Sequence, residues 1–182
     1  MTPEQQLQAL VDRYTPAIAA LARAVRKRLH AQLPPAFEMV YDNYNALVIG
    51  YSPTAKTSNA VLSIALYPAW VRLFFLYGAG LPDPDGLLQG NGKRVRSLVL
   101  ADAAQIDSPP VRTLIAQAVA RAPVPFGQAK SMSLSVRAIS ANLRPRRAPP
   151  GSASSKPVTR AAAAERPPGR PARTRAARKV VA

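Results

Sequence analysis

The sequence predicts an α+β domain with a curved antiparallel sheet of five to six strands. An N-terminal helix and a later helix would pack on one face of the sheet, and a disordered basic C-terminal tail would follow. Apolar residues recur at three- and four-residue steps near the N-terminus and at every second residue further on. All Tyr, Phe and Trp residues lie between Tyr14 and Phe126. The 182 residues suffice for one core plus an extension.

The first helix is expected to begin at Thr2. Thr2 is a capping residue, Pro3 suits a first helical turn, and Gln5 completes the spacing of a capping box. Pro16 is expected to kink or restart this helix, and Pro34 follows its end. The apolar side chains of one helical face are Leu7, Leu10, Val11, Tyr14, Ile18, Leu21, Val25 and Leu29.

Alternating apolar residues predict strands in the middle of the chain. Strands are expected at residues 37–42, 46–51, 61–67, 70–77 and 94–100. Their short connections favour antiparallel pairing. A loop is expected at 78–92 with one helical turn at 84–88. A second helix at 109–122 and a last strand at 131–140 complete the predicted domain.

Charge divides the chain into two parts. Residues 1–143 contain 14 Lys and Arg and 8 Asp and Glu, whereas residues 144–182 contain 11 Lys and Arg and one acid, Glu165. The second part has no Leu, Ile, Phe, Tyr, Trp or Met. Such a segment cannot bury enough apolar surface to offset its ordering entropy. We therefore predict a folded domain at 1–143 and a disordered Arg/Ala/Pro-rich tail at 144–182.

Composition excludes several chemistries. Without cysteine the chain has no disulfide, thiolate metal site, iron–sulfur cluster or cysteine nucleophile. Its single histidine, His30, is interpreted as a surface residue near a helix C-terminus. Asp83 is interpreted as a cap and the other carboxylates as turn or solvated residues, so no metal site is expected. The charge-free run at 57–71 is too short and polar for a membrane span, and acids near the N-terminus favour a cytoplasmic protein.

Two regions are candidate ligand sites. Trp70 and Arg72 share one face of a predicted strand, and with Tyr41 and Tyr44 they could bind a small ligand or a protein at the sheet face. The alternative is ordinary sheet packing. In the glycine-rich stretch at 86–94, backbone donors with Lys93, Arg94 and Arg96 could hold a small anion. The alternative there is a hairpin, because Arg94 occupies the position of the Ser or Thr of a phosphate loop.

The tail is expected to bind nucleic acid or another polyanion nonspecifically. If about half of its ten excess charges met phosphates, the log–log salt slope would be about −4 to −5. The tail has no aromatic residue for base stacking. The alternative is compositional drift without a partner. The candidate residues are Arg144, Arg146, Arg147, Arg166, Arg170, Arg173, Arg175, Arg178 and Lys179.

Several stretches together resemble a known family. They are Tyr-Asp-Asn-Tyr-Asn-Ala-Leu-Val-Ile-Gly-Tyr at 41–51, Tyr-Pro-Ala-Trp-Val-Arg-Leu-Phe-Phe-Leu at 67–76, Gly-Ala-Gly-Leu-Pro-Asp-Pro-Asp at 78–85, Leu-Leu-Gln-Gly-Asn-Gly-Lys at 87–93, and residues 137–147. The chain resembles the YdhG-like family of small bacterial proteins, a domain family of unknown function, over roughly residues 15–147. The resemblance implies an α+β fold with a curved antiparallel sheet. Some relatives are described as frataxin-like iron chaperones, which implies iron as a ligand. The resemblance implies no catalytic residues.

The sequence thus favours a non-enzymatic binding module of unknown ligand, without a cofactor, whose basic tail adds affinity for polyanions. One alternative, from the resemblance, is a frataxin-like intracellular iron-binding chaperone. The other is a small-molecule enzyme that uses Tyr41 or Lys93 as an acid or base.

Overall fold

The computed structural model describes residues 1–147 and confirms the α+β fold class. Within this part of the chain the helices are α1 (Pro3–Val11), α2 (Pro16–Gln32) and α3 (Pro109–Ala120). The strands are β1 (Phe37–Asp42), β2 (Leu47–Ser52), β3 (Leu62–Leu66), β4 (Val71–Phe75), β5 (Arg96–Leu100) and β6 (Ser133–Ile139). Short 3₁₀ helices are η1 (Thr57–Asn59), η2 (Gly78–Gly80) and η3 (Ala103–Asp107).

The N-terminal helical segment is divided where the sequence places Pro16. The Thr2 hydroxyl accepts from the Gln5 amide at 3.2 Å, and the Gln5 side chain accepts from the Thr2 amide at 2.8 Å, which confirms the capping box. The second helix begins at Pro16, where the Thr15 hydroxyl accepts from the Ile18 amide. Proline has no N–H to donate to a preceding turn but suits the first turn of a new helix, so the helix restarts.

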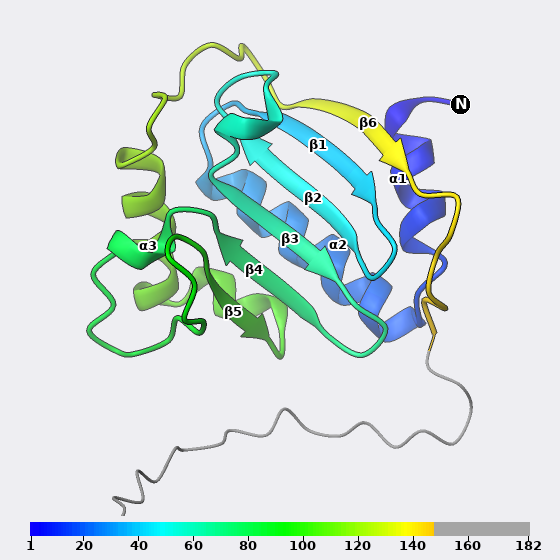
Figure 1. Cartoon of the computed structure of the whole chain (residues 1–182), viewed down its shortest axis with the longest axis horizontal. Coiled ribbons are helices and arrows are strands. Elements are labelled where there is room, and N and C mark those ends of the chain that lie inside the picture. The colour runs from blue at the N-terminus through cyan, green and yellow to red at the C-terminus, as the bar shows by residue number, and fades with distance from the viewer. Residues whose placement is uncertain (148–182) are drawn as a thin grey trace, which may run out of the picture. The chain divides into compact units, whose positions relative to one another are not determined.

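The six strands in the described part form one mixed sheet in the order β5-β4-β3-β2-β1-β6 (Figure 1). Four pairings are antiparallel, as predicted for hairpin-connected strands. The fifth differs, because β6 pairs with β1 in parallel. β6 reaches β1 after α3 and a long connection, so no tight turn dictates an antiparallel direction.

The two faces of the sheet have different surroundings. Helix α2 lies behind the sheet in Figure 1, against the face whose side chains form the core. Val40, Ile49, Ile64 and Leu73 face one another across four strands on that side and are buried. Because side chains alternate along strands, their sequence neighbours point to the opposite side, which we call the open face.

Two local predictions differ from the structure. Residues 84–88 form no helix; instead the Asp83 carboxylate accepts from the Leu87 and Leu88 amides at 3.0 and 2.7 Å and closes a turn. The predicted boundary after residue 143 is also too early. The Arg144 amide donates to the Tyr44 carbonyl at 2.9 Å, and Arg146 is buried, so these residues pack on the domain. The predicted disorder beyond Arg147 lies outside the described residues.

Candidate functional site

Tyr41 and Arg72 both lie on the open face, in one row across the sheet. Tyr41 is opposite Val48, Val48 is opposite Ala65, and Ala65 is opposite Arg72. Three strand spacings separate the two ends of this row, which is about 14 Å. The Tyr41 hydroxyl contacts the Thr57 hydroxyl of η1, so Tyr41 is half-covered by the loop after β2. Arg72 and Tyr41 therefore share a face without touching.

Tyr44 and Trp70 lie in two tight turns at the same end of the sheet. β1 and β3 run in the same direction, so the β1–β2 and β3–β4 turns meet at one end (Figure 1). Tyr44 is 55% exposed and Trp70 is 42% exposed. The Trp70 ring lies 5.7 Å from the Tyr67 ring at an interplanar angle of 33°. We call Tyr44, Tyr67 and Trp70 the hairpin aromatics.

Neutral groups hold the Arg72 guanidinium. It donates to the Ser97 hydroxyl at 3.0 Å and to the Gln89 side-chain oxygen at 3.3 Å. Gln89 is fixed by two backbone hydrogen bonds with Ser97, of 2.8 and 2.9 Å. The Arg72 Nε has no partner among residues 1–147. No carboxylate in this part of the chain compensates the charge of Arg72.

The glycine-rich loop leads into strand β5 rather than into a helix. Lys93 is exposed, and the Arg94 guanidinium lies 4.5 Å above the centre of the Tyr77 ring. Arg96 donates to the Gly92 and Val95 carbonyls at 2.6 and 2.8 Å, which ties the loop to itself. Lys93 precedes β5 and Tyr41 lies on β1, so the structure places the two residues named in the enzyme hypothesis on separate strands of the sheet.

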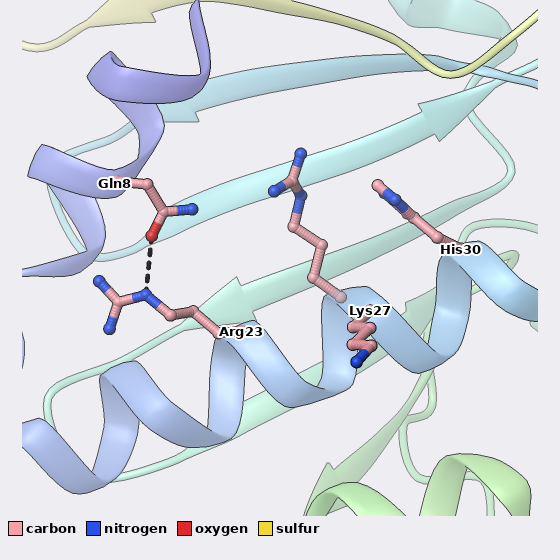
Figure 2. Close-up of a pocket in the computed structure, with 5 residues that line it drawn as sticks. Gln8, Arg23, Lys27 and His30 are labelled. Atoms are coloured by element: carbon pink, nitrogen blue, oxygen red, sulfur yellow. Dashed lines mark hydrogen bonds between the residues drawn. The ribbon is translucent and has the colours of Figure 1, made fainter.

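A cavity of about 350 Å³ lies on the helical side of the sheet. Figure 2 shows its lining from α1 and α2, and none of the predicted site residues is among them. Arg23 donates to the Gln8 side chain at 2.7 Å and to Asp12 at 2.6 Å. The lining residues are Gln8, Arg23, Arg26, Lys27 and His30.

Arg26 and His30 hold the buried carboxylate of Glu38. Arg26 donates to both Glu38 oxygens at 2.8 Å and to both Glu4 oxygens at 2.8 Å, which occupies its guanidinium. The His30 Nε2 lies 3.0 Å from Glu38 Oε1. Burial acts to raise the pKa of Glu38, but hydrogen bonds from Arg26 and His30 outweigh burial and lower it to about 2. The charges of Arg26 and Glu38 are thus paired within the fold.

The cluster corrects the interpretation of His30 and of Glu38 as surface groups. His30 contacts Glu38 and packs edge-on against the Tyr51 ring, with ring centroids 5.8 Å apart. Burial and the nearby charge of Glu38 raise the pKa of Tyr51 well above its usual value. The spacing of Arg26 and His30, four residues apart on one helix, was a signal for a shared partner. Nothing in the sequence identified Glu38 as that partner.

Arg144, Arg146 and Arg147, predicted as tail residues, contact the domain. Arg146 is 5% exposed, and its guanidinium lies 2.5 Å from the carboxylate of Asp42, which is itself 2% exposed. Arg13 binds the other Asp42 oxygen at 2.9 Å. A buried carboxylate requires cationic partners, so Arg146 is part of the fold and is not available to a polyanion. Arg147 donates to the Tyr14 carbonyl at 3.2 Å.

The side chains of Arg144 and Arg147 stay exposed on the domain surface. The remaining predicted tail residues, Arg166, Arg170, Arg173, Arg175, Arg178 and Lys179, lie outside the described residues.

The carboxylates of residues 1–147 are almost all engaged. Glu4, Asp12, Glu38, Asp42 and Asp107 form ion pairs. Asp83 and Asp102 accept from backbone amides. Many cations of the same part of the chain form no ion pair within it: Lys27, Lys56, Arg72, Lys93, Arg94, Arg96, Arg112, Arg121, Lys130, Arg137, Arg144 and Arg147. The domain surface therefore carries excess positive charge.

No group of three or more His, Cys, Asp or Glu side chains in residues 1–147 could hold a metal ion. No helix of this part is long and apolar enough to cross a membrane. The chain matches no protein-family model, no curated protein and no solved structure. The YdhG-like resemblance and the iron-chaperone alternative stay predictions.

Proposed function

We propose that the protein is a non-catalytic module that binds polyanions, with nucleic acid as its ligand. The observation that carries the proposal is the division of charge within residues 1–147. Almost all of their carboxylates are engaged in ion pairs or hydrogen bonds, whereas most of their cations have no acidic partner in that part of the chain. Cations that no acid of the domain neutralises can replace the counterions of a phosphate backbone.

The sequence beyond Arg147 adds further charge of the same sign. It contains one acid, Glu165, and its basic residues are Lys156, Arg160, Arg166, Arg170, Arg173, Arg175, Arg178 and Lys179. Because Arg147 is held on the Asp12 and Tyr14 carbonyls, this segment is tethered to a cationic domain. Two tethered groups of cations bind one polyanion more tightly than either would alone.

The experiment compares the full chain with a full-length variant that neutralises six cations. Arg166, Arg170, Arg173, Arg175, Arg178 and Lys179 are replaced by Gln, and binding of labelled duplex DNA is followed by fluorescence anisotropy. If half of the six contact phosphates, the log–log slope over about 50 to 200 mM salt becomes shallower by about 3.

A matched control replaces the exposed Arg112 of α3 by Gln, which should change the slope by less than about 1. Equal and salt-insensitive binding by the full chain and the neutralised variant would overturn the proposal, as would a lack of binding at about 50 mM salt.

A further inference from the structure

The exposed aromatic residues of the described domain gather at one end of the sheet. The large hydrophobic residues exposed within residues 1–147 are Met1, Tyr44, Trp70, Val95 and Ile139. The two aromatics among them both lie in tight turns at the same end of the sheet (Figure 1). Single exposed apolar side chains need no explanation, but a group of aromatic rings on one edge is a candidate binding surface.

The backbone fixes how far apart these rings lie. The Asn43 amide donates to the Ala46 carbonyl at 3.0 Å, and the Tyr67 amide donates to the Trp70 carbonyl at 2.9 Å, so both turns are tight. By strand spacing, the backbones of Tyr44 and Trp70 are about 10 to 15 Å apart. Tyr67 packs beside Trp70 and supports its ring while leaving it 42% exposed. A few nucleotides of an extended strand span this distance.

Cations border the hairpin aromatics. The Arg144 amide is bonded to the Tyr44 carbonyl, which places an exposed arginine at the first turn. Arg147 is fixed nearby on the loop between α1 and α2, and Arg72 follows Trp70 by two residues. None of the three pairs with a carboxylate within residues 1–147.

We propose that the hairpin aromatics, with Arg144 and Arg147 beside them, form a base-stacking platform for single-stranded nucleic acid. The inference rests on the proposed function, because phosphate contacts supply most of the affinity. Aromatic rings stack on bases whose faces are accessible, and in a duplex those faces are covered by neighbouring bases. Single-strand binding needs aromatic rings that stack on bases and cations that contact the phosphates, and a platform of rings bordered by arginines supplies both. The tail lacks aromatic residues, so the domain would supply the stacking and the tail the charge.

Trp70 is the single tryptophan of the chain, so its fluorescence reports directly on the platform. The full-length protein is titrated with oligo(dT) and, separately, with heparin, a polyanion without bases. Oligo(dT) should quench the fluorescence of Trp70, and heparin should bind without quenching it.

In anisotropy measurements, Trp70→Ala and Tyr44→Ala should each weaken oligo(dT) binding by about fivefold to a hundredfold, and leave heparin affinity unchanged. Trp70→Phe keeps an aromatic face and should retain most of the oligo(dT) affinity. Val95→Ala, at an apolar side chain that is 39% exposed away from these turns, is the matched control and should have no effect.

The outcomes separate this inference from the proposed function. If both polyanions bind with a salt slope, but quenching is absent and the Tyr44 and Trp70 variants bind oligo(dT) normally, the stacking platform is wrong and the proposed function stands. If neither oligo(dT) nor heparin binds at about 50 mM salt, both are wrong. Preference of the full chain for duplex DNA over oligo(dT) would also contradict the platform.

Discussion

The two faces of the sheet carry charge in different ways. On the helix-covered side, the buried carboxylates of Glu38 and Asp42 are each held by two basic side chains. On the open face, the Arg72 guanidinium meets only the neutral oxygens of Ser97 and Gln89. Charge on the first side maintains the fold, since a buried ion without its partner is costly. On the second side, Arg72 has no acidic partner within residues 1–147.

This difference also separates the two candidate ligand regions. The cavity between α1 and α2 is lined by basic residues, but Arg23 and Arg26 are already bound to acids or amides of α1. A ligand there would compete with contacts that hold the helices together. A ligand at the hairpin aromatics displaces only water. The surface at the hairpin aromatics is therefore the better candidate ligand site, although it encloses no cavity.

The largest effect is expected from Glu38→Gln. The substitution removes the carboxylate charge that Arg26 and His30 contact, while Arg26 keeps Glu4. Removing one partner of a buried ion pair costs about 3 to 5 kcal/mol of the free energy of unfolding. Because Arg26 keeps its contact with Glu4, we expect a loss at the lower end, about 3 kcal/mol. Urea unfolding measures it.

The control for this prediction is Asp85→Asn, an exposed carboxylate, which should change the free energy of unfolding by less than about 0.5 kcal/mol. A loss below about 1 kcal/mol for Glu38→Gln would mean that this cluster contributes little to the fold.

The free energy of unfolding should depend on pH through the same Glu38 cluster. The pKa of Glu38 is about 2 in the folded state, below its value of 4.5 in the absence of the fold. A lowered carboxyl pKa stabilises the fold above the unfolded value, and this contribution is lost as pH falls from about 5 towards 2. The lowered pKa of Glu38 contributes about 3 kcal/mol to the free energy of unfolding at neutral pH.

Unfolding free energies measured at several pH values should therefore converge between the wild-type protein and Glu38→Gln as the solution becomes acidic. Both proteins retain Glu4, whose pKa is also lowered by its hydrogen bond with Arg26. Two curves that stay parallel from neutral to acidic pH would contradict the role assigned to Glu38.

Local sequence signals predicted most of the fold. Alternation predicted five strands that the structure contains, and Thr2 with Gln5 predicted the first helix start. The parallel pairing of β6 with β1 was not predicted, because the partner of a strand that follows a long connection depends on tertiary packing. Alternation also predicted that Trp70 and Arg72 share a face of one strand, but β4 begins at Val71 and Trp70 lies in the turn before it.

The buried charge could not be predicted in the same way. Both partners of Glu38, Arg26 and His30, lie on α2, and one of the two partners of Asp42 is Arg146, over a hundred residues away along the chain. In composition, Arg146 is indistinguishable from the basic residues after it, because a pairing between distant elements leaves no local pattern. Only the folded geometry separates an arginine that holds the core from one that is free for a ligand.

The smallest effect on stability is expected at the hairpin aromatics, and the neighbouring residues Trp70 and Val71 test it. Trp70 is 42% exposed, whereas Val71 is fully buried on the helix-covered side. Trp70→Ala should lower the free energy of unfolding by less than about 1 kcal/mol, because the ring is 42% exposed in a turn. Val71→Ala removes fewer atoms but leaves a cavity in the core and should cost about 2 kcal/mol. If Trp70→Ala proves the more damaging of the two, the Trp70 ring belongs to the packing of the domain, and its exposure is no longer an argument for binding.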